Sequence, residues 1–210
     1  MRFRDRADAG CQLGAALERY RTRRPLVAGL ARGGVVVAAE VARALDAPLH
    51  LTVVRKLGHP AHPELGLGAL AEDGVPVWNE PLLGHFAIDE QKRYAVLARE
   101  RDEMRRRRAK YRPGLLPADL TGRTVVLVDD GLATGGSARA AIGFVRRRGA
   151  EWVALAVPVG APDVVAMLRD AADEVFALVT PADLAAVGQW YEHFDQCTDR
   201  SVLDVLQDHY

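Results

Sequence analysis

Four consecutive apolar residues, Val125 to Val128, lead straight into two carboxylates, Asp129 and Asp130. A strand this apolar is expected in a parallel sheet that helices cover on both faces. Comparable runs recur through the chain and alternate with amphipathic stretches. The pattern predicts strands at 25–30, 49–54, 124–128, 152–158 and 174–178, and helices at 35–45, 137–148 and 163–170. The expected fold class is therefore α/β, with an open, doubly wound and mostly parallel sheet and right-handed crossovers.

Three segments depart from this alternation. Residues 57–74 are rich in Gly, Pro and His, which favours a flexible lid over an ordinary connection. Residues 88–111 are predicted to form a long charged helix with a narrow apolar stripe. Residues 181–210 follow the last predicted strand and carry several aromatic side chains, so we expect them to form a small C-terminal hood over the sheet.

Length and composition favour one domain. The chain has 210 residues, of which 49% are hydrophobic, and this is enough to bury one sizeable core. We therefore expect a single domain over 1–210. It is expected to consist of a core at about 21–180, the hood at 181–210 with residues 1–20 as a candidate addition, and the lid at 57–74.

The charge balance argues against several classes of partner. Lys+Arg and Asp+Glu each number 28, so the net charge is zero and gives no general attraction to nucleic acid or to an anionic membrane. The two cysteines, Cys11 and Cys197, are too few for a disulfide framework. No apolar stretch reaches the ~18 residues of a membrane span, and the first residues do not resemble a signal peptide. We expect a cytoplasmic protein that binds neither nucleic acid nor membrane.

The residues after the strand at 124–128 suit a ribose phosphate. Thr134 to Ser137 offer backbone N–H groups and two hydroxyls at the positive end of a predicted helix, which is a favourable place for a phosphate. Asp129 and Asp130 suit instead the hydroxyls of a cis-diol, or they help to position a divalent cation. A ligand with a phosphate, a diol and a metal ion is a ribose phosphate. The alternative is that the two acids only cap the turn that follows.

Residues 125–137 resemble the phosphoribosyl-pyrophosphate signature of type I phosphoribosyltransferases: four apolar residues, two acids, then Thr-Gly and small hydroxyl residues. The likeness extends over nearly the full chain to a less characterised bacterial subgroup of this family. It implies that Asp129 and Asp130 hold the ribose hydroxyls. It places the 5-phosphate on the loop Ala133, Thr134, Gly135, Gly136 and Ser137. Purine-salvage members carry a further Asp where this chain has Ala133, so specificity for hypoxanthine and guanine is not expected.

A second loop, Ala31-Arg32-Gly33-Gly34, follows the strand at 25–30. The family has an Arg-Gly-Gly or Lys-Gly-Gly turn here that binds pyrophosphate through backbone amides, and the resemblance implies a cis Ala31–Arg32 bond in the ligand-bound state. A plain Gly-Gly turn between strand and helix is the alternative. Arg55 and Lys56, at the end of the strand at 49–54, are further candidates to bind the pyrophosphate. Their alternative is ordinary strand-end charge.

The lid at 57–74 lies where the family has its flexible catalytic loop. His59, His62 and Glu64 occur within it, but a mobile, Pro-rich loop without a fourth ligand makes a weak metal site. We expect the two histidines to be polar lid residues. Residues 64–70 are expected to pair as a hairpin with residues 75–78.

The resemblance implies transfer of phosphoribose from 5-phosphoribosyl-1-pyrophosphate to a nitrogenous base or related acceptor, with Mg²⁺ as cofactor. The candidate catalytic residues are Asp129, Asp130, Arg32 and Lys56, and the two acids are also candidate neighbours of the metal ion. The family places base recognition in the hood, where Trp190 and Tyr191 are candidates to stack on a base. With Phe194, these side chains could instead fasten the hood to the sheet.

Two other functions fit the same residues. One is a non-catalytic regulator that senses phosphoribosyl pyrophosphate, and the other is a hydrolase or phosphorylase of a ribose-phosphate compound. The acceptor base stays open. For the oligomeric state, the stripe at Ile88, Val96, Leu97 and Met104 looks too narrow to be buried fully against one sheet. We expect part of it to pack on a second copy of the chain, giving a homodimer.

Overall fold

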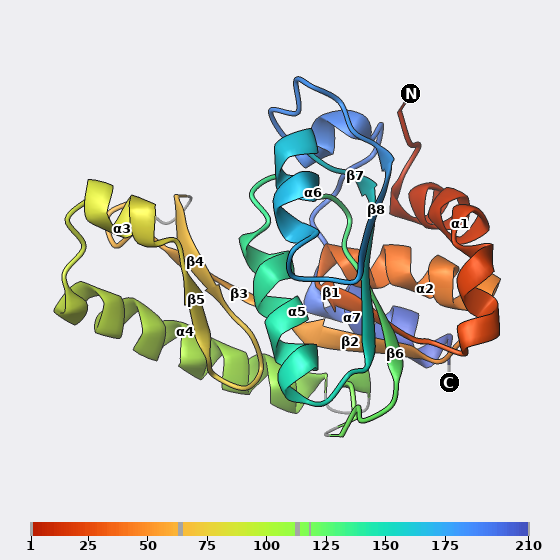
Figure 1. Ribbon diagram of the computed structural model, residues 1–210, viewed down its shortest axis with the longest axis horizontal. Coiled ribbons are helices and arrows are strands. Elements are labelled where there is room, and N and C mark those ends of the chain that lie inside the picture. The colour runs from red at the N-terminus through yellow and green to blue at the C-terminus, as the bar shows by residue number, and fades with distance from the viewer. Residues whose placement is uncertain (1, 63–64, 112–113, 118, 210) are drawn as a thin grey trace.

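The computed structural model describes residues 2–62, 65–111, 114–117 and 119–209. Its centre is a five-stranded sheet in the order β2-β1-β6-β7-β8, in which every pairing is parallel (Figure 1). The strands are β1 Leu26–Ala31, β2 Leu49–Val53, β6 Thr124–Val128, β7 Trp152–Val159 and β8 Glu174–Val179. Each lies within one residue of its predicted bounds, so the predicted α/β fold with a mostly parallel sheet is confirmed.

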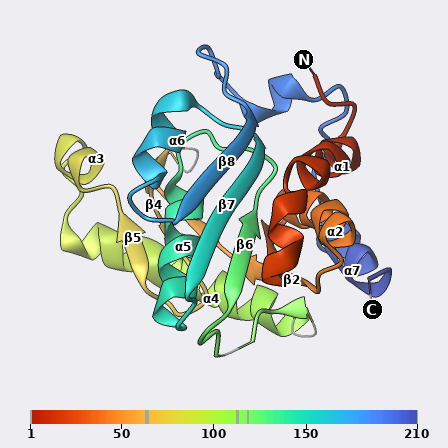
Figure 2. The ribbon, with the colours of Figure 1, turned by 45° about the vertical axis from the view of Figure 1, so that its right-hand side comes forward.

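Helices cover both faces of this sheet (Figure 2). On one face lie α1 (Arg6–Ala16), α2 (Gly33–Leu45) and α7 (Asp199–Gln207), and on the other lie α5 (Gly136–Arg147) and α6 (Pro162–Leu168). Along β6, Val125 and Leu127 join the core beneath α5 and α6, whereas Val126 and Val128 join the core beneath α1 and α2. Burial on both faces explains why this strand has no polar residue after Thr124.

The chain between β2 and β6 forms a second, antiparallel sheet, which we call the lobe together with α3 (Glu80–His85) and α4 (Glu90–Lys110). Its strands are β3 Arg55–Gly58, β4 Gly66–Leu70 and β5 Pro76–Trp78, in that order. The strands, α3 and the first part of α4 project to one side of the main sheet (Figure 1).

The hairpin expected within the lid is confirmed. Residues 66–70 do pair with residues 76–78, as predicted. The flexibility expected of the lid stays a prediction, but Leu57, Leu67 and Leu70 within it are almost completely buried. The reason is that β3 pairs with β4 along one edge and α4 and α5 cover the sheet. Pro63 and Glu64 lie outside the described residues.

Most of the apolar stripe of α4 is buried within its own chain. Ile88 is 7% exposed and packs with Leu67 and Leu83, while Val96 and Met104 are 5% and 3% exposed in the core beneath α2. The lobe covers most of the stripe, whereas Leu97 is only partly buried, so packing of part of the stripe on a second copy stays a prediction, as does the homodimer itself.

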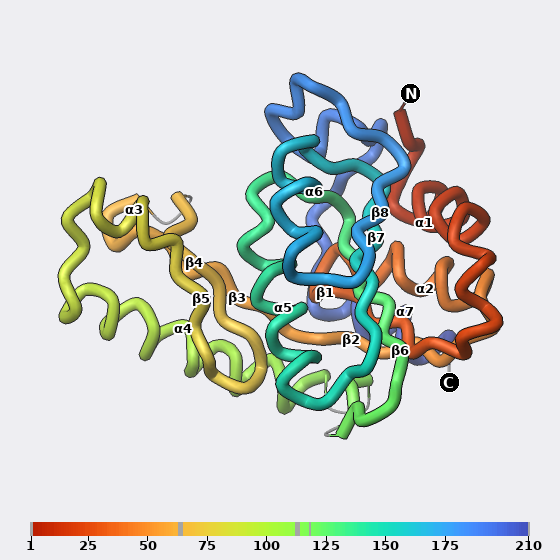
Figure 3. The backbone as a smooth tube through the Cα atoms, viewed as in Figure 1, coloured from red at the N-terminus to blue at the C-terminus, as the bar shows by residue number. Residues whose placement is uncertain are grey.

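The N-terminal residues lie beside the hood, near the upper edge of the molecule in Figure 3. Phe3 N donates to the Trp190 carbonyl at 2.8 Å, and Glu192 N donates to the Phe3 carbonyl at 2.8 Å. The described residues also include 3₁₀ turns at Glu18–Arg23 and Val187–Trp190. None of the described helices combines the length and the apolar character needed to cross a membrane.

Candidate functional site

The two loops singled out in the sequence meet at the carboxyl edge of the main sheet. β1 and β6 are neighbours, and the turn after β1 packs on the acids after β6. A Cβ on Gly34 would lie 2.6 Å from the Val128 carbonyl oxygen and 2.8 Å from Asp129 Cα. A Cβ on Gly33 would lie 2.8 Å from Asp130 Cγ. The backbones can come this close only because both residues are glycine.

The turn after β1 is the first turn of a helix rather than a separate loop. Gly33 and Gly34 are the first residues of α2, and Arg32 is its N-cap residue. The Ala31–Arg32 peptide bond is cis. Val35 N donates to the Arg32 carbonyl at 3.1 Å, whereas the N–H groups of Gly33 and Gly34 have no acceptor within the helix, and the helix dipole makes this end favourable for an anion.

The loop after the acids surrounds a hollow of about 160 Å³. Gly135 is the N-cap residue of α5 and has φ +74, a left-handed conformation that favours glycine. No described atom lies within 4 Å of where a Cβ on Gly136 would be. Most of the predicted phosphate loop lines the hollow, and its lining residues are Asp129, Gly131, Leu132, Ala133, Thr134, Gly135, Ser137, Ala138 and Val187.

The acid pair is held by hydrogen bonds and by one ion pair. Asp130 N donates to Asp129 Oδ1 at 2.9 Å, and Arg6 Nε donates to Asp130 Oδ2 at 2.7 Å. Burial, together with the negative charge of Asp130, raises the pKa of the Asp129 carboxyl well above its ordinary value. The Tyr191 hydroxyl donates to the Asp130 carbonyl at 2.6 Å and so ties the hood to this loop.

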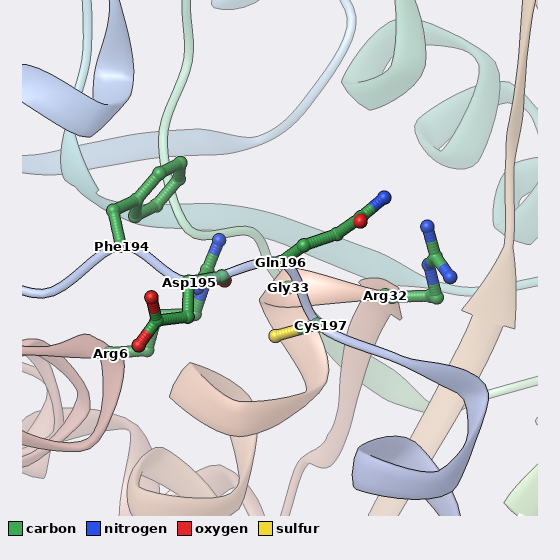
Figure 4. Close-up of a pocket in the computed structure, with 7 residues that line it drawn as sticks. All are labelled: Arg6, Arg32, Gly33, Phe194, Asp195, Gln196 and Cys197. Carbon is green, nitrogen blue, oxygen red and sulfur yellow. Dashed lines mark hydrogen bonds between the residues drawn. The ribbon is translucent and has the colours of Figure 1, made fainter.

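A second hollow, of about 360 Å³, lies next to the pyrophosphate turn. Figure 4 shows Arg6, Phe194 and Asp195 close together, with Arg32 on the other side of Gly33. The lining residues are Arg6, Arg32, Gly33, Phe194, Asp195, Gln196 and Cys197. Arg6, Gln196 and Cys197 were not singled out as site residues in the sequence, whereas Asp195 ends the stretch 185–195 in which the family resemblance places base recognition. Among 25 arginines (28 Lys+Arg less three Lys), nothing local distinguishes Arg6.

Arg32 points toward the C-terminal helix. Its guanidinium lies 3.8 Å from an oxygen of Asp199, at the start of α7. The same carboxylate accepts from the Tyr111 hydroxyl at 2.5 Å and from Lys110 Nζ at 2.9 Å. The Tyr111 hydrogen bond and the nearby cations hold the pKa of Asp199 below its ordinary value.

Arg55 and Lys56 do not end the second strand as expected. β2 stops at Val53, and both residues belong to β3. Arg55 donates through Nε and Nη2 to Oε2 of Glu100 on α4, at 2.9 and 2.7 Å. Lys56 is exposed and lies opposite Ala69 of β4. Neither belongs to the described residues that line the two hollows.

The hood aromatics divide into two roles. Tyr191 is 4% exposed, and its ring lies 5.5 Å from that of Phe3 and 4.9 Å from that of Phe194. This burial favours the alternative in which Tyr191 fastens the hood to the sheet, and stacking of Tyr191 on a base stays a prediction. Trp190 is half-buried against the same cluster, and a role for it in base binding stays a prediction. Phe194 is the aromatic residue that lines the larger hollow.

The lid histidines serve a local turn. His59 Nδ1 accepts from the backbone N–H groups of Ala61 and His62 at 3.1 and 3.2 Å. The two imidazole rings lie 5.3 Å apart. Within the described part of the chain, no three His, Cys, Asp or Glu side chains gather as a metal site would require, and Glu64 lies outside that part.

Comparisons with known proteins agree with this geometry. Residues 13–191 match the family model described as the phosphoribosyl transferase domain. A Mycobacterium tuberculosis protein, provisionally named as a phosphoribosyl transferase, is 47% identical over 204 residues, which are 97% of this chain and 46% of that protein. The chain thus spans about half the length of the curated relatives that it matches along its length. A uracil phosphoribosyltransferase from Lactobacillus gasseri is 45% identical over 60 residues, 29% of each chain. The crystal structure of a protein from Thermus thermophilus matches with a TM-score of 0.81 and 45% identity, and covers 100% of this chain and 99% of that one.

Proposed function

The chain belongs to the phosphoribosyl transferase domain family, and from this premise we propose that it transfers phosphoribose from 5-phosphoribosyl-1-pyrophosphate to a nitrogenous base or related acceptor. The contact between the Gly33-Gly34 turn and the Asp129-Asp130 pair is the observation that carries the proposal. The substrate bears a phosphate, a diol and a pyrophosphate on one ribose. The protein must bind these three groups close together, because one ribose carries them all. The two loops can do so because they follow neighbouring strands.

The roles of the residues follow from their positions. Asp129 and Asp130 accept hydrogen bonds from the ribose hydroxyls, and the loop from Ala133 to Ser137 holds the 5-phosphate at the start of α5. Arg32 and the first N–H groups of α2 hold the pyrophosphate. Arg55 would have to leave Glu100 to bind the pyrophosphate, and Lys56 remains a candidate beside it.

The reaction asks for positioning more than for covalent work. The bond from C1 of the ribose to the pyrophosphate oxygen breaks, the acceptor nitrogen bonds to C1, and the electron pair leaves with pyrophosphate. The protein aligns the acceptor with C1, places positive groups where the leaving charge develops and excludes water. Closure of the lobe over the ligand would supply the last of these.

Mg²⁺ fits this site as an ion bound largely through the ligand. Hydrogen bonds among the described residues engage Oδ1 of Asp129 and Oδ2 of Asp130, while the second oxygen of each carboxylate can accept from a ribose hydroxyl or a metal-bound water. No third acid joins them among the described residues. Two carboxylates with substrate oxygens suit an ion that keeps several waters. Bound Mg²⁺ would offset the charge of the pyrophosphate.

The acid pair provides the first test. We expect Asp129→Asn combined with Asp130→Asn to abolish binding of phosphoribosyl pyrophosphate in calorimetry, while the protein still melts cooperatively. Asp46→Asn is the matched control, because Asp46 is an exposed C-cap residue of α2 in a left-handed conformation that Asn also tolerates. Unchanged affinity in the double variant would overturn the proposed function.

A screen of acceptors separates the alternatives. Pyrophosphate release is followed with labelled substrate and a panel of bases, including uracil because of the Lactobacillus gasseri relative. Because Ala133 replaces an acid, hypoxanthine and guanine should be poor acceptors. Binding without release for any acceptor would indicate the regulator, and formation of ribose-phosphate products without an acceptor would indicate the hydrolase.

A further inference from the structure

Arg6 reaches the centre of the site from the far end of the sequence. It is the first residue of α1, whose N-cap Asp5 accepts from Asp8 N. Its guanidinium donates through Nε to Asp130 Oδ2 at 2.7 Å and through Nη1 to the Asp195 carbonyl at 2.8 Å. The guanidinium carbon also lies 3.8 Å from the centroid of the Phe194 ring. One side chain thus contacts the proposed ribose acid and two residues of the hood, and Figure 4 shows it beside the latter two, Phe194 and Asp195.

The position of Arg6 is unfavourable for a cation with no further purpose. A positive charge at a helix N-terminus opposes the helix dipole. The side chain is only 11% exposed, so the guanidinium has also lost most of its contact with water. Its compensation comes from Asp130, the Asp195 carbonyl and the Phe194 ring, all outside α1. These contacts, rather than the stability of α1, account for an arginine here.

The ion pair fixes how Asp130 can meet a ligand. A carboxylate rotates about one bond, and engagement of Oδ2 by Arg6 sets that rotation. The lack of a side chain at Gly33 leaves the space that this oxygen occupies, because a Cβ there would overlap Asp130 Oδ2. Since Arg6 also contacts residues 194 and 195, a change at Asp130 is transmitted to the wall of the larger hollow.

We propose that Arg6 is a positioning residue for the ribose end of the substrate: it orients Asp130 and joins this acid to the hood wall at residues 194–195. The inference rests on the proposed function. It specifies that Arg6 affects ligands with a ribose and leaves the pyrophosphate turn unaffected, because the backbone amides that bind pyrophosphate belong to α2.

The test compares three ligands on one variant. Binding of phosphoribosyl pyrophosphate, ribose 5-phosphate and inorganic pyrophosphate is measured by calorimetry for the wild type and for Arg6→Ala. Loss of a hydrogen bond to a charged group should weaken the two ribose ligands at least about tenfold. The affinity for pyrophosphate should stay within about twofold. Methylguanidinium added to Arg6→Ala should restore part of the lost affinity, because it can occupy the vacated position between Asp130 and Phe194.

Two further variants make the result interpretable. Arg19→Ala removes another arginine that pairs with an acid, Glu174, and stacks on an aromatic ring, but it lies in the 3₁₀ turn at Glu18–Arg23 outside the site, so all three affinities should be unchanged. Arg6→Lys keeps the charge without the planar fork, and we expect it to recover less affinity for the ribose ligands than methylguanidinium does. It also serves as the test variant if Arg6→Ala does not fold.

The outcomes distinguish a failure of this inference from a failure of the proposed function on which it rests. If the wild type binds neither ribose ligand, the proposed function fails and the inference fails with it. If the wild type binds both and Arg6→Ala leaves them unchanged, only the inference is overturned. Equal weakening of all three ligands would mean that Arg6 merely supports the fold, and this too would overturn the inference.

Discussion

At Gly33 the backbone of α2 passes so close to Asp130 that a methyl group has no room. An alanine there would overlap the carboxylate oxygen that Arg6 holds, and its Cβ would lie 2.9 Å from Arg6 Nε. We expect Gly33→Ala to displace Asp130. The stability should fall by about 1–3 kcal/mol, the usual cost of overpacking. Binding of phosphoribosyl pyrophosphate should weaken at least about tenfold, because a hydrogen bond to a charged group is disturbed.

Gly84→Ala is the control for this substitution. Gly84 lies within α3, and no described atom is within 4 Å of the added methyl position. Alanine should therefore raise the stability by about 0.5–1 kcal/mol, as expected for a helix interior, without changing affinity. Denaturant unfolding and calorimetry on both variants check the pair. Normal affinity in Gly33→Ala would show that the turn can move away from the acids.

Asp129 carries a stability cost that depends on pH. Its folded-state pKa is raised, so folding favours the protonated form, and stability is lost as pH rises from the ordinary value of 3.8 through the raised value. Asp129→Asn keeps the oxygen that accepts from Asp130 N but cannot ionise. Its melting temperature should match the wild type near pH 3 and exceed it at pH 7. This gain in melting temperature should develop as the pH rises through the raised pKa of Asp129.

Calorimetric melting between pH 3 and pH 8 measures this difference. A gain that is constant over the whole range would contradict the titration of Asp129 as its source. A variant that is more stable and no longer binds the substrate would show that the site gives up stability for ligand binding.

Among the elements, the lobe is the one whose position should respond to ligand. The turn that joins β3 to β4 is closed by His59 N donating to the Leu65 carbonyl at 2.8 Å, and its tip is exposed. Phosphoribosyl pyrophosphate with Mg²⁺ should slow amide exchange at residues 59–65. Inorganic phosphate should not, because it lacks the pyrophosphate end that a closed lobe would contact.

Hydrogen exchange followed by mass spectrometry provides the measurement, and peptides from β4 are the internal reference because their amides already pair within the sheet. Equal protection by both ligands, or by neither, would make the turn a passive insertion. The proposed exclusion of water would then need another source.

Elements with a strong apolar period could be predicted from the sequence, and elements without one could not. β6 and β7 lie within the predicted bounds to a residue because their runs are largely apolar. α1 was missed because glycines replace large side chains on its buried face: a Cβ on Gly14 would lie 2.7 Å from Ala44 Cβ of α2. β3 was missed because its first two residues, Arg55 and Lys56, are charged and therefore do not give the apolar pattern by which a strand is predicted.

Over the whole molecule, the site depends on contacts between distant parts of the chain. Arg6 and Asp130 are 124 positions apart, and no local pattern connects them. The phosphate loop could be predicted because the groups that suit a phosphate and a diol lie in one continuous stretch. The place of Gln196 and Cys197 could not, since they join the site only when the C-terminal segment folds back beside Arg6 and Gly33.

The homodimer is the prediction at the largest scale, and exposed aromatic side chains now support it in place of the apolar stripe. Most of the α4 stripe is covered within the chain, but Tyr94 on the same helix is 71% exposed, and Phe86, which precedes this helix in the sequence, is 37% exposed. We expect light scattering at micromolar concentration to give twice the chain mass, and Tyr94→Glu to shift it toward the monomer, since a buried charge would oppose the contact. A monomeric wild type would contradict the prediction, and Arg200→Glu on α7 is the surface control.

The lack of space between Gly33 and Asp130 also has a genetic consequence. Alanine at position 33 overlaps the Asp130 side chain, so shortening residue 130 creates the room that alanine needs. The two substitutions should therefore show epistasis: Gly33→Ala alone lowers stability, but in an Asp130→Gly background the same change should be nearly neutral. Second-site suppressors of Gly33→Ala selected for folding should accordingly concentrate at residue 130. A selection for activity would not recover them, because each suppressor removes an acid on which substrate binding depends.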